Sequence, residues 1–213
     1  MDKLAERTPA SELAETAYVS ASAYLDRIDS VFAHTEKVWP YGHNTTVGTV
    51  PPETMLNESL RTYRNTDADR YIFHFLQPHA PFVNCPGRYG HDGTIGGTQR
   101  VWKGLRHGEF DKESVWQDYR ENLRIGLSAV ETLVENVDGD VVITADHGNA
   151  IGESGLYGHP EYVPHPSIKR VPWATATGGG EMTYTVRPRE EITGATESRV
   201  GLEEQLSHLG YRS

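Results

Sequence analysis

One stretch of the chain, VVITADHGNAIGESGLYGHP at residues 141–160, constrains the fold more than any other. It opens with four β-branched residues after the turn at residues 138–140, a pattern that is typical of a buried, central and parallel strand. Asp146 and His147 come directly after this predicted strand. Because ligands bind outside the carboxyl ends of strands in open α/β sheets, we expect the pair to lie at a functional site.

A glycine-rich loop follows the pair and ends at a second histidine, His159. Glycine tolerates tight turns, so residues 148–158 can fold back and return His159 to Asp146 and His147. A carboxylate with two imidazoles is a suitable ligand set for a divalent transition metal, and favours Zn²⁺ or Mn²⁺ over Ca²⁺ or Mg²⁺. On its own, however, an Asp-His dipeptide after a strand is more often a cap or a turn.

A second apolar run at residues 71–76 predicts another strand, and His79 follows it between two prolines. The restricted backbone there suits a positioned ligand, although a loop histidine that caps a neighbouring carbonyl is the alternative. His74, inside the run, is expected to be packed in the sheet. A helix predicted over residues 114–136, with a capping box at Ser114 to Gln117, joins the two strands by a right-handed crossover.

We therefore expect the strands at 71–76 and 141–145 to be parallel neighbours or near neighbours. Their carboxyl ends would then share one edge, and His79, Asp146, His147 and His159 would lie within about 10 Å of one another, close enough for one ion and one ester group.

The whole pattern predicts an α/β fold, a mainly parallel central sheet flanked by helices, in a single domain over residues 1–213. The helix after residue 114 has an apolar stripe that is expected to face the core. The stripe comprises Tyr119, Leu123, Leu127, Val130 and Val134. The other expected elements are a short helix at 12–15, a strand at 17–20, an irregular stretch at 22–50, a helix from Pro51 to Asn65, a long loop at 83–110, strands at 171–176 and 182–186, and a helix at 197–209. The long loop is either a cationic lid or a solvated excursion.

Composition narrows the function classes. The net charge of −10 argues against a general nucleic-acid binder. The lone cysteine, Cys85, excludes an intramolecular disulfide and is interpreted as an incidental thiol. No apolar run approaches the roughly 18 residues that span a membrane, and the charged N-terminus lacks a signal-peptide core, so we expect a cytoplasmic protein. The oligomeric state cannot be predicted from these features.

Several short strings together resemble the alkaline phosphatase superfamily, in its sulfatase-like and phosphoethanolamine-transferase-like branches. They are Asp-His-Gly at 146–148, Gly-Glu at 152–153, Gly-Leu-Tyr-Gly-His-Pro at 155–160, Arg-Val-Pro-Trp at 170–173 and HFLQPHAPF at 74–82. The resemblance covers about residues 70–213. It implies an alkaline phosphatase-like core in which Asp146 and His147 bind a metal beside the nucleophile. It also implies that His159 lies at a second metal or at the phosphate side, and that His79 lines the active site.

The superfamily also has an N-terminal strand that ends in an acidic ligand and is followed by a Ser, Thr or Cys nucleophile. No such segment precedes residue 17, and no nucleophile motif accompanies Thr45, Thr46 or Thr49. The chain is therefore interpreted as an N-terminally shortened homologue, a fragment of a split gene or a member that has lost catalysis.

The leading hypothesis is a metal-dependent hydrolase or transferase that acts on small anionic phosphate or sulfate esters. In it, His79 and His159 are catalytic and hold the ester oxygens, and Asp146, His147 and His159 bind the metal. The alternatives are an inactive homologue that serves as a binding or structural module, and an unrelated α/β domain with chance matches.

Overall fold

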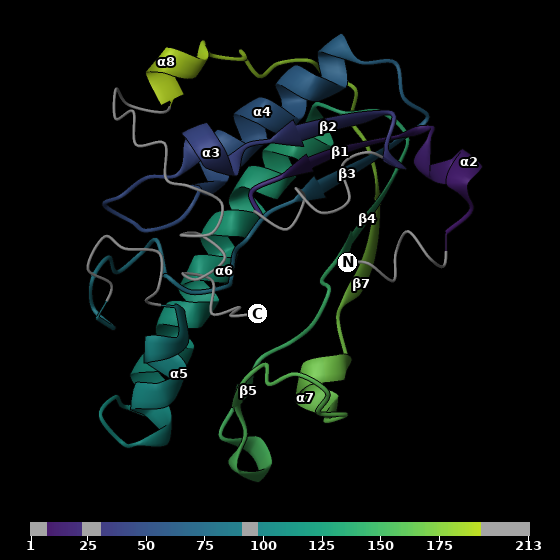
Figure 1. The fold of residues 1–213 in the computed structure, drawn as a ribbon. Helices are drawn as coiled ribbons and strands as arrows, with labels where there is room; N and C mark the ends of the chain where they lie inside the picture. Colours follow the sequence, from purple (N-terminus) through teal and green to yellow (C-terminus); the bar gives the residue numbers. More distant parts are fainter. Residues whose placement is uncertain (1–7, 23–30, 91–97, 193–213) are drawn as a thin grey trace.

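A three-stranded parallel sheet forms the centre of the fold in the computed structural model, which describes residues 8–22, 31–90 and 98–192 (Figure 1). Its strands are β1 (Thr16–Ser20), β2 (His34–Lys37) and β3 (Arg70–His74), in the order β2-β1-β3. The middle strand, β1, is buried along its whole length, as expected for a parallel strand with neighbours on both sides. The mixed α/β class and the strands near 17–20 and 71–76 are confirmed.

Helix α4 (Pro52–Asn65) covers one face of this sheet, beside α3 (Trp39–Gly42) (Figure 1). Val19 of β1 and Phe73 of β3 point to that face and pack in one core with Met55 of α4. Side chains alternate along a strand, so Tyr18, Ser20 and His74 belong to the opposite face. The predicted helix from Pro51 to Asn65 is confirmed, with proline in its first turn.

Helix α6 (Lys112–Glu135) packs against α4 near its C-terminal end, where Leu133 meets Leu60 in a shared core. Its N-cap is Asp111, whose carboxylate accepts from the Ser114 N–H at 2.8 Å, so the capping box predicted at Ser114 is wrong by one turn.

The predicted apolar stripe of α6 is only partly buried. Leu123 and Leu127 are 36% and 43% exposed, whereas the buried line of the helix runs through Val115, Asn122, Gly126 and Leu133. The segment after β3 approaches α6 so closely that a Cβ on Gly126 would lie 3.0 Å from the Gln77 side chain. Periodicity of apolar residues could not find this face, since a polar and a small residue lie at its middle.

Strand β4 (Asp140–Thr144) does not join the parallel sheet. It pairs antiparallel with β7 (Trp173–Thr177) in a separate two-stranded sheet, so the prediction that it is a central parallel neighbour of β3 is wrong. Residues of β4 alternate between exposed and half-buried, which is the pattern of a strand with one solvated face. The β-branched run predicted the strand but not its partner, because the hydrogen bonds of β4 go to β7.

A third sheet is a short hairpin of β5 (Ala150–Ile151) and β6 (Tyr157–Gly158), with the 3-10 turn η4 (Glu153–Gly155) between them. Helix α7 (Pro166–Lys169) follows. These elements lie at the opposite end of the molecule from α4 in Figure 1.

Other expectations need correction. The stretch at 22–50 contains β2 and α3, and the long loop at 83–110 contains α5 (Thr98–Arg106). The early helix, α2, spans Ala10–Leu13. The helix predicted at 197–209 lies outside the described residues. No helix in the described ranges has the length and apolar character that crossing a bilayer requires.

The segment from residue 181 to α8 (Arg189–Ile192), predicted to include a strand at 182–186, is instead held by side chains. Tyr184 donates its N–H to Asn136 at 2.7 Å, and Arg64 donates to the Tyr184 carbonyl at 2.8 Å. Asn57 mimics a backbone partner, since its Oδ1 accepts from the Arg187 N–H at 2.8 Å and its Nδ2 donates to the Arg187 carbonyl at 3.1 Å. These contacts replace a β ladder.

We predict that Asn57→Ala lowers the free energy of unfolding by about 1–3 kcal/mol, because the fully buried amide makes both bonds and its removal takes away the acceptor of the Arg187 N–H, whereas the Arg187 carbonyl keeps its bond from Arg61. The matched control is Asn65→Ala, at an exposed position on the same helix, which should change stability by less than about 0.5 kcal/mol. Urea unfolding measures both. An equal effect of the two substitutions would contradict the role given to Asn57.

Candidate active site

The four residues singled out in the sequence come together in space. The ring centroids of His79 and His159 are 5.3 Å apart, and those of His147 and His159 are 4.2 Å apart in a stacked arrangement. Asp146 Oδ2 lies 3.8 Å from His147 Nε2. The predicted convergence of these residues is therefore confirmed, although β3 and β4 belong to different sheets; their functional roles stay predictions.

His79 is positioned by α6. Asn122 of that helix donates to the His79 carbonyl at 3.3 Å and accepts from the Val83 N–H at 3.1 Å. Gln77 anchors the other side of the loop by donating to the Val50 carbonyl at 3.0 Å. The backbone around His79 is thus fixed on both sides by buried or half-buried amides.

His159 is positioned by the β5–β6 hairpin. Gly158 has a φ of +69°, and a Cβ there would lie 3.0 Å from the Trp102 indole of α5, so any other residue would be strained and would crowd the indole. The predicted return of the glycine-rich loop is confirmed at this position. Trp102 itself belongs to the core formed by α5, the start of α6 and Phe82.

The three imidazoles share one hydrogen-bonding arrangement. Nδ1 of His79 lies 2.6 Å from the Ala80 carbonyl, and Nδ1 of His147 lies 3.0 Å from the Gly148 carbonyl. Nδ1 of His159 lies 2.7 Å from Asn149 Oδ1. An oxygen of this kind can only accept, so each Nδ1 carries a proton and, in the neutral ring, the lone pair is on Nε2. Histidines that bind metals in proteins are usually held in this way.

Asp146 and His147 offer two donor atoms at a suitable spacing. Two ligand atoms that each lie about 2 Å from one ion are themselves about 3–4 Å apart, and the Asp146 Oδ2 to His147 Nε2 distance is 3.8 Å. The Asp146 side chain is 72% exposed. Its Oδ1 accepts from the His147 N–H at 3.0 Å.

Burial keeps two of the rings neutral. Burial lowers the pKa of His79, and burial together with the neighbouring His79 and His147 rings lowers the pKa of His159 to about 3. At neutral pH, Nε2 of these rings therefore accepts rather than donates. In this state they can bind a cation or take up a proton; the predicted role of holding an ester oxygen by a hydrogen bond from Nε2 would require a protonated ring.

The sequence reasoning missed several residues of this region. His74, expected to be packed, has its Nδ1 at 3.0 Å from the Tyr18 hydroxyl and at 3.2 Å from Ser20 Oγ. Asn149 links His159 to Tyr119 by donating to the Tyr119 hydroxyl at 3.2 Å. The one available signal was a histidine at the end of a strand; nothing in the pattern pointed to Tyr18, Ser20 or Asn149.

The donor set matches a transition metal in its chemistry, since it combines neutral imidazoles, each with a free Nε2, and a carboxylate. Its spacing is open: within the described ranges, no three His, Cys, Asp or Glu side chains stand close enough together to hold a metal ion. Asp146 and His147 form the part of the set with a spacing that suits one ion.

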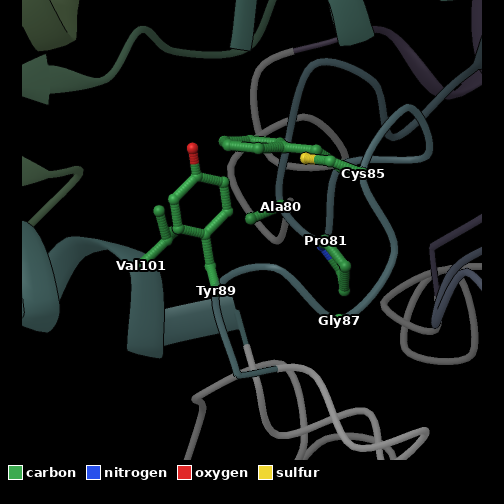
Figure 2. Close-up of a pocket in the computed structure, with 7 residues that line it drawn as sticks. Ala80, Pro81, Cys85, Gly87, Tyr89 and Val101 are labelled. Carbon is green, nitrogen blue, oxygen red and sulfur yellow. The ribbon is translucent and has the colours of Figure 1, made fainter. Parts of the chain in front are cut away.

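A small pocket lies beside the loop of His79 and contains the lone cysteine (Figure 2). Ala80, Phe82, Tyr89 and Val101 give it a mostly apolar lining, and there is room inside for about one water molecule. It is too small for an ester substrate. Burial, followed by the nearby Asp118 carboxylate, raises the pKa of the Cys85 thiol to about 12, which supports the interpretation of an incidental thiol.

Two of the basic side chains in the loop at 83–110 form ion pairs with carboxylates of the protein. Arg88 pairs with Asp118 at 2.9 Å, and Arg100 pairs with Glu109 at 3.1 Å. Tyr89 also donates to Asp118, so this carboxylate of α6 binds two neighbouring residues of the loop. The contacts favour a loop anchored on α6 over a cationic lid.

Comparison with known proteins adds no relative: no family model, no curated protein and no solved structure matches the chain. The resemblance to the alkaline phosphatase superfamily is therefore a prediction that rests on the short strings quoted above.

We predict that His159 does not titrate between pH 5 and 8 in chelator-treated protein, as followed by the ring ¹H and ¹⁵N signals, since the pKa of its buried ring is lowered to about 3. The ring signals of His107, at an exposed position, are followed in the same spectra as the internal control. Below about pH 6.5, His159 is protonated in the unfolded chain but stays neutral in the folded protein. The free energy of unfolding should therefore fall as the pH drops below about 6.5, by at most about 1.4 kcal/mol per pH unit from this residue. A His159 midpoint near 6.5 would contradict the prediction.

We also predict that Cys85 of the folded protein reacts with iodoacetamide at pH 8 at least about a hundredfold more slowly than the same thiol in urea, because its thiolate is scarce when the pKa is about 12. Mass spectrometry of timed samples measures both rates. Equal rates would mean that the thiol is exposed and easily ionised.

Proposed function

We propose that the cluster of Asp146, His147, His159 and His79 binds a divalent transition metal, Zn²⁺ or Mn²⁺, and that the protein hydrolyses or transfers phosphate or sulfate esters. The single observation that carries the proposal is the arrangement of the three imidazoles. Each has its Nδ1 hydrogen bonded to an oxygen acceptor, which leaves Nε2 as the donor atom beside a carboxylate.

Asp146 and His147 would be the first ligands, because their donor atoms already have a suitable spacing of 3.8 Å. His159 is stacked on His147 and neutral at physiological pH, and its Nδ1 is held by Asn149, so its Nε2 is the candidate for a third donor. When bound, a divalent ion supplies charge stabilisation for the ester oxygens and lowers the pKa of a nucleophile.

His79 would accept a proton through Nε2. Its Nδ1–H is donated to the Ala80 carbonyl, so the other nitrogen has the lone pair that can accept a proton from an attacking water or hydroxyl group. Asn122 and the loop backbone would hold the ring in place during this step. The ester oxygens, by contrast, would bind to the ion and not to His79 or His159.

A second candidate is a module that binds a metal without turnover. It is favoured by the state of Ser20, a hydroxyl at the carboxyl end of the parallel strand β1. Ser20 is completely buried and its Oγ accepts from the Ser22 N–H at 3.0 Å, so it is poorly placed to attack an ester.

The decisive experiment combines binding with turnover. Calorimetry with Zn²⁺ and with Mn²⁺ on chelator-treated protein should show one ion per chain, with affinity reduced at least about tenfold in Asp146→Ala, the loss expected when a ligand is removed. The matched control is Asp67→Ala, at an exposed position of the linker after α4, which should leave affinity unchanged. Equal affinities of the two variants would refute the proposed site.

Turnover of 4-nitrophenyl phosphate and of 4-nitrophenyl sulfate, with each metal added back, separates the two candidates. Hydrolysis that needs the metal and is lost at least about a hundredfold in His79→Gln supports the enzyme, since a positioned general base contributes about 10²–10⁴-fold. Tight, Asp146-dependent metal binding without any turnover supports the binding module.

A further inference from the structure

The side chain of Asn149 connects the histidine at the end of the β5–β6 hairpin to the long helix α6. Its Oδ1 lies 2.7 Å from His159 Nδ1, and its Nδ2 donates to the Tyr119 hydroxyl at 3.2 Å. Asn149 directly precedes β5 and His159 directly follows β6, whereas Tyr119 belongs to α6. One amide therefore contacts both the ring of the proposed site and the helix behind it.

The backbone on both sides of Asn149 is fixed. Gly148 donates its N–H to the Ile168 carbonyl at 2.8 Å, and a Cβ at position 148 would collide with the carbonyl oxygen of Ser167. On the other side, Ala150 begins β5 and is completely buried. The amide of Asn149 thus extends from an anchored part of the chain.

The ring of Tyr119 is held by three other aromatic side chains. It meets Phe82 and Trp102 edge to face, with centroids 6.0 and 6.2 Å apart, and it stacks on Trp116 at 5.9 Å. Phe82 and Trp102 belong to a buried core. The Tyr119 hydroxyl is therefore a fixed point to which the Asn149 amide is attached.

Two residues of α6 act on two different histidines of the cluster. Tyr119 reaches His159 through Asn149, and Asn122 donates to the His79 carbonyl at 3.3 Å. Residues three apart on a helix lie on the same face, so both contacts come from one side of α6. Since the His79 and His159 ring centroids are 5.3 Å apart, this face of α6 sets the position of the two rings relative to each other.

We infer that Asn149 and Tyr119 are positioning residues of the proposed site. Asn149 accepts the Nδ1–H of His159, which keeps the lone pair of the neutral ring on Nε2, and Tyr119 holds the amide in place. The inference rests on the proposed function, because His159 acts there through Nε2. If the amide had the opposite orientation, its N–H would face Nδ1 and the ring proton would lie on Nε2. The tautomer of His159 therefore reports directly on the role of Asn149.

The test is the ¹⁵N spectrum of chelator-treated protein labelled in its histidines, recorded at neutral pH. Wild-type His159 should have a protonated Nδ1 and an unprotonated Nε2. Asn149→Leu, which has a similar size and no acceptor, should move His159 toward the Nε2–H tautomer. Asn149→Asp keeps an acceptor oxygen and should retain the wild-type tautomer, as should the control Asn65→Leu at an exposed position of α4. Tyr119→Phe, which keeps the packed ring, should move part of the population.

Zn²⁺ calorimetry of the same variants connects the tautomer to the proposed site. Asn149→Leu should lower the Zn²⁺ affinity by about 10–100-fold, the loss typical when a group that orients a ligand is removed. Asn149→Asp should restore most of the affinity, and Asn65→Leu should leave it unchanged. A loss that Asn149→Asp does not restore would overturn the positioning role.

The outcomes separate the inference from the proposed function. An unprotonated Nδ1 in wild-type His159, or an unchanged tautomer in Asn149→Leu, overturns the inference whether or not Zn²⁺ binds. A changed tautomer in Asn149→Leu without any Zn²⁺ binding or turnover by the wild-type protein overturns the proposed function and supports Asn149 as the residue that holds the ring. If Asn149→Leu does not fold, the wild-type and Tyr119→Phe spectra decide: a shift in Tyr119→Phe supports the inference, and identical His159 signals overturn it.

Discussion

The parallel pairing of β3 with β1 is the constraint on which the rest of the site depends. It buries β1 on both faces, which commits one face to the apolar core under α4 and leaves the other to Tyr18, Ser20 and His74. It also ends β3 at His74, so that the following loop must turn toward α6 and present His79. A shift of β3 by one residue would exchange its two faces and turn His74 away from the Tyr18 and Ser20 hydroxyls.

Buried amides then connect this sheet to the helices. Asn122 satisfies backbone groups of the His79 loop, Gln77 of that loop donates to the Val50 carbonyl ahead of α4, and Asn57 and Asn136 satisfy backbone groups of residues 184–187. An unpaired backbone group in these positions would cost about 1–3 kcal/mol. Polar side chains therefore pair with the backbone groups of these irregular segments, as neighbouring strands would in a larger sheet. This is why the chain can hold irregular segments close to its core.

The electrostatics of the cluster favour one state of the histidines. Stacked or adjacent imidazolium ions would repel each other, and burial opposes charge on each ring, so His79 and His159 are held neutral. A neutral imidazole whose Nδ1–H is already donated is a better ligand for a cation than for an anionic ester. This preference is the physical argument for the proposed metal ion.

The sequence by itself determined which residues meet and most of the local structure. The β-branched run before Asp146, the apolar run before His79 and the glycines before His159 predicted two strands and a tight return, since these properties depend on neighbouring residues. It did not determine that β4 pairs with β7, that Asn122 and Gly126 form the buried line of α6, or that Tyr18 and Ser20 hold the His74 ring. Those features depend on contacts between segments far apart in the chain, where backbone hydrogen bonds and close packing select one partner among several that the local pattern allows.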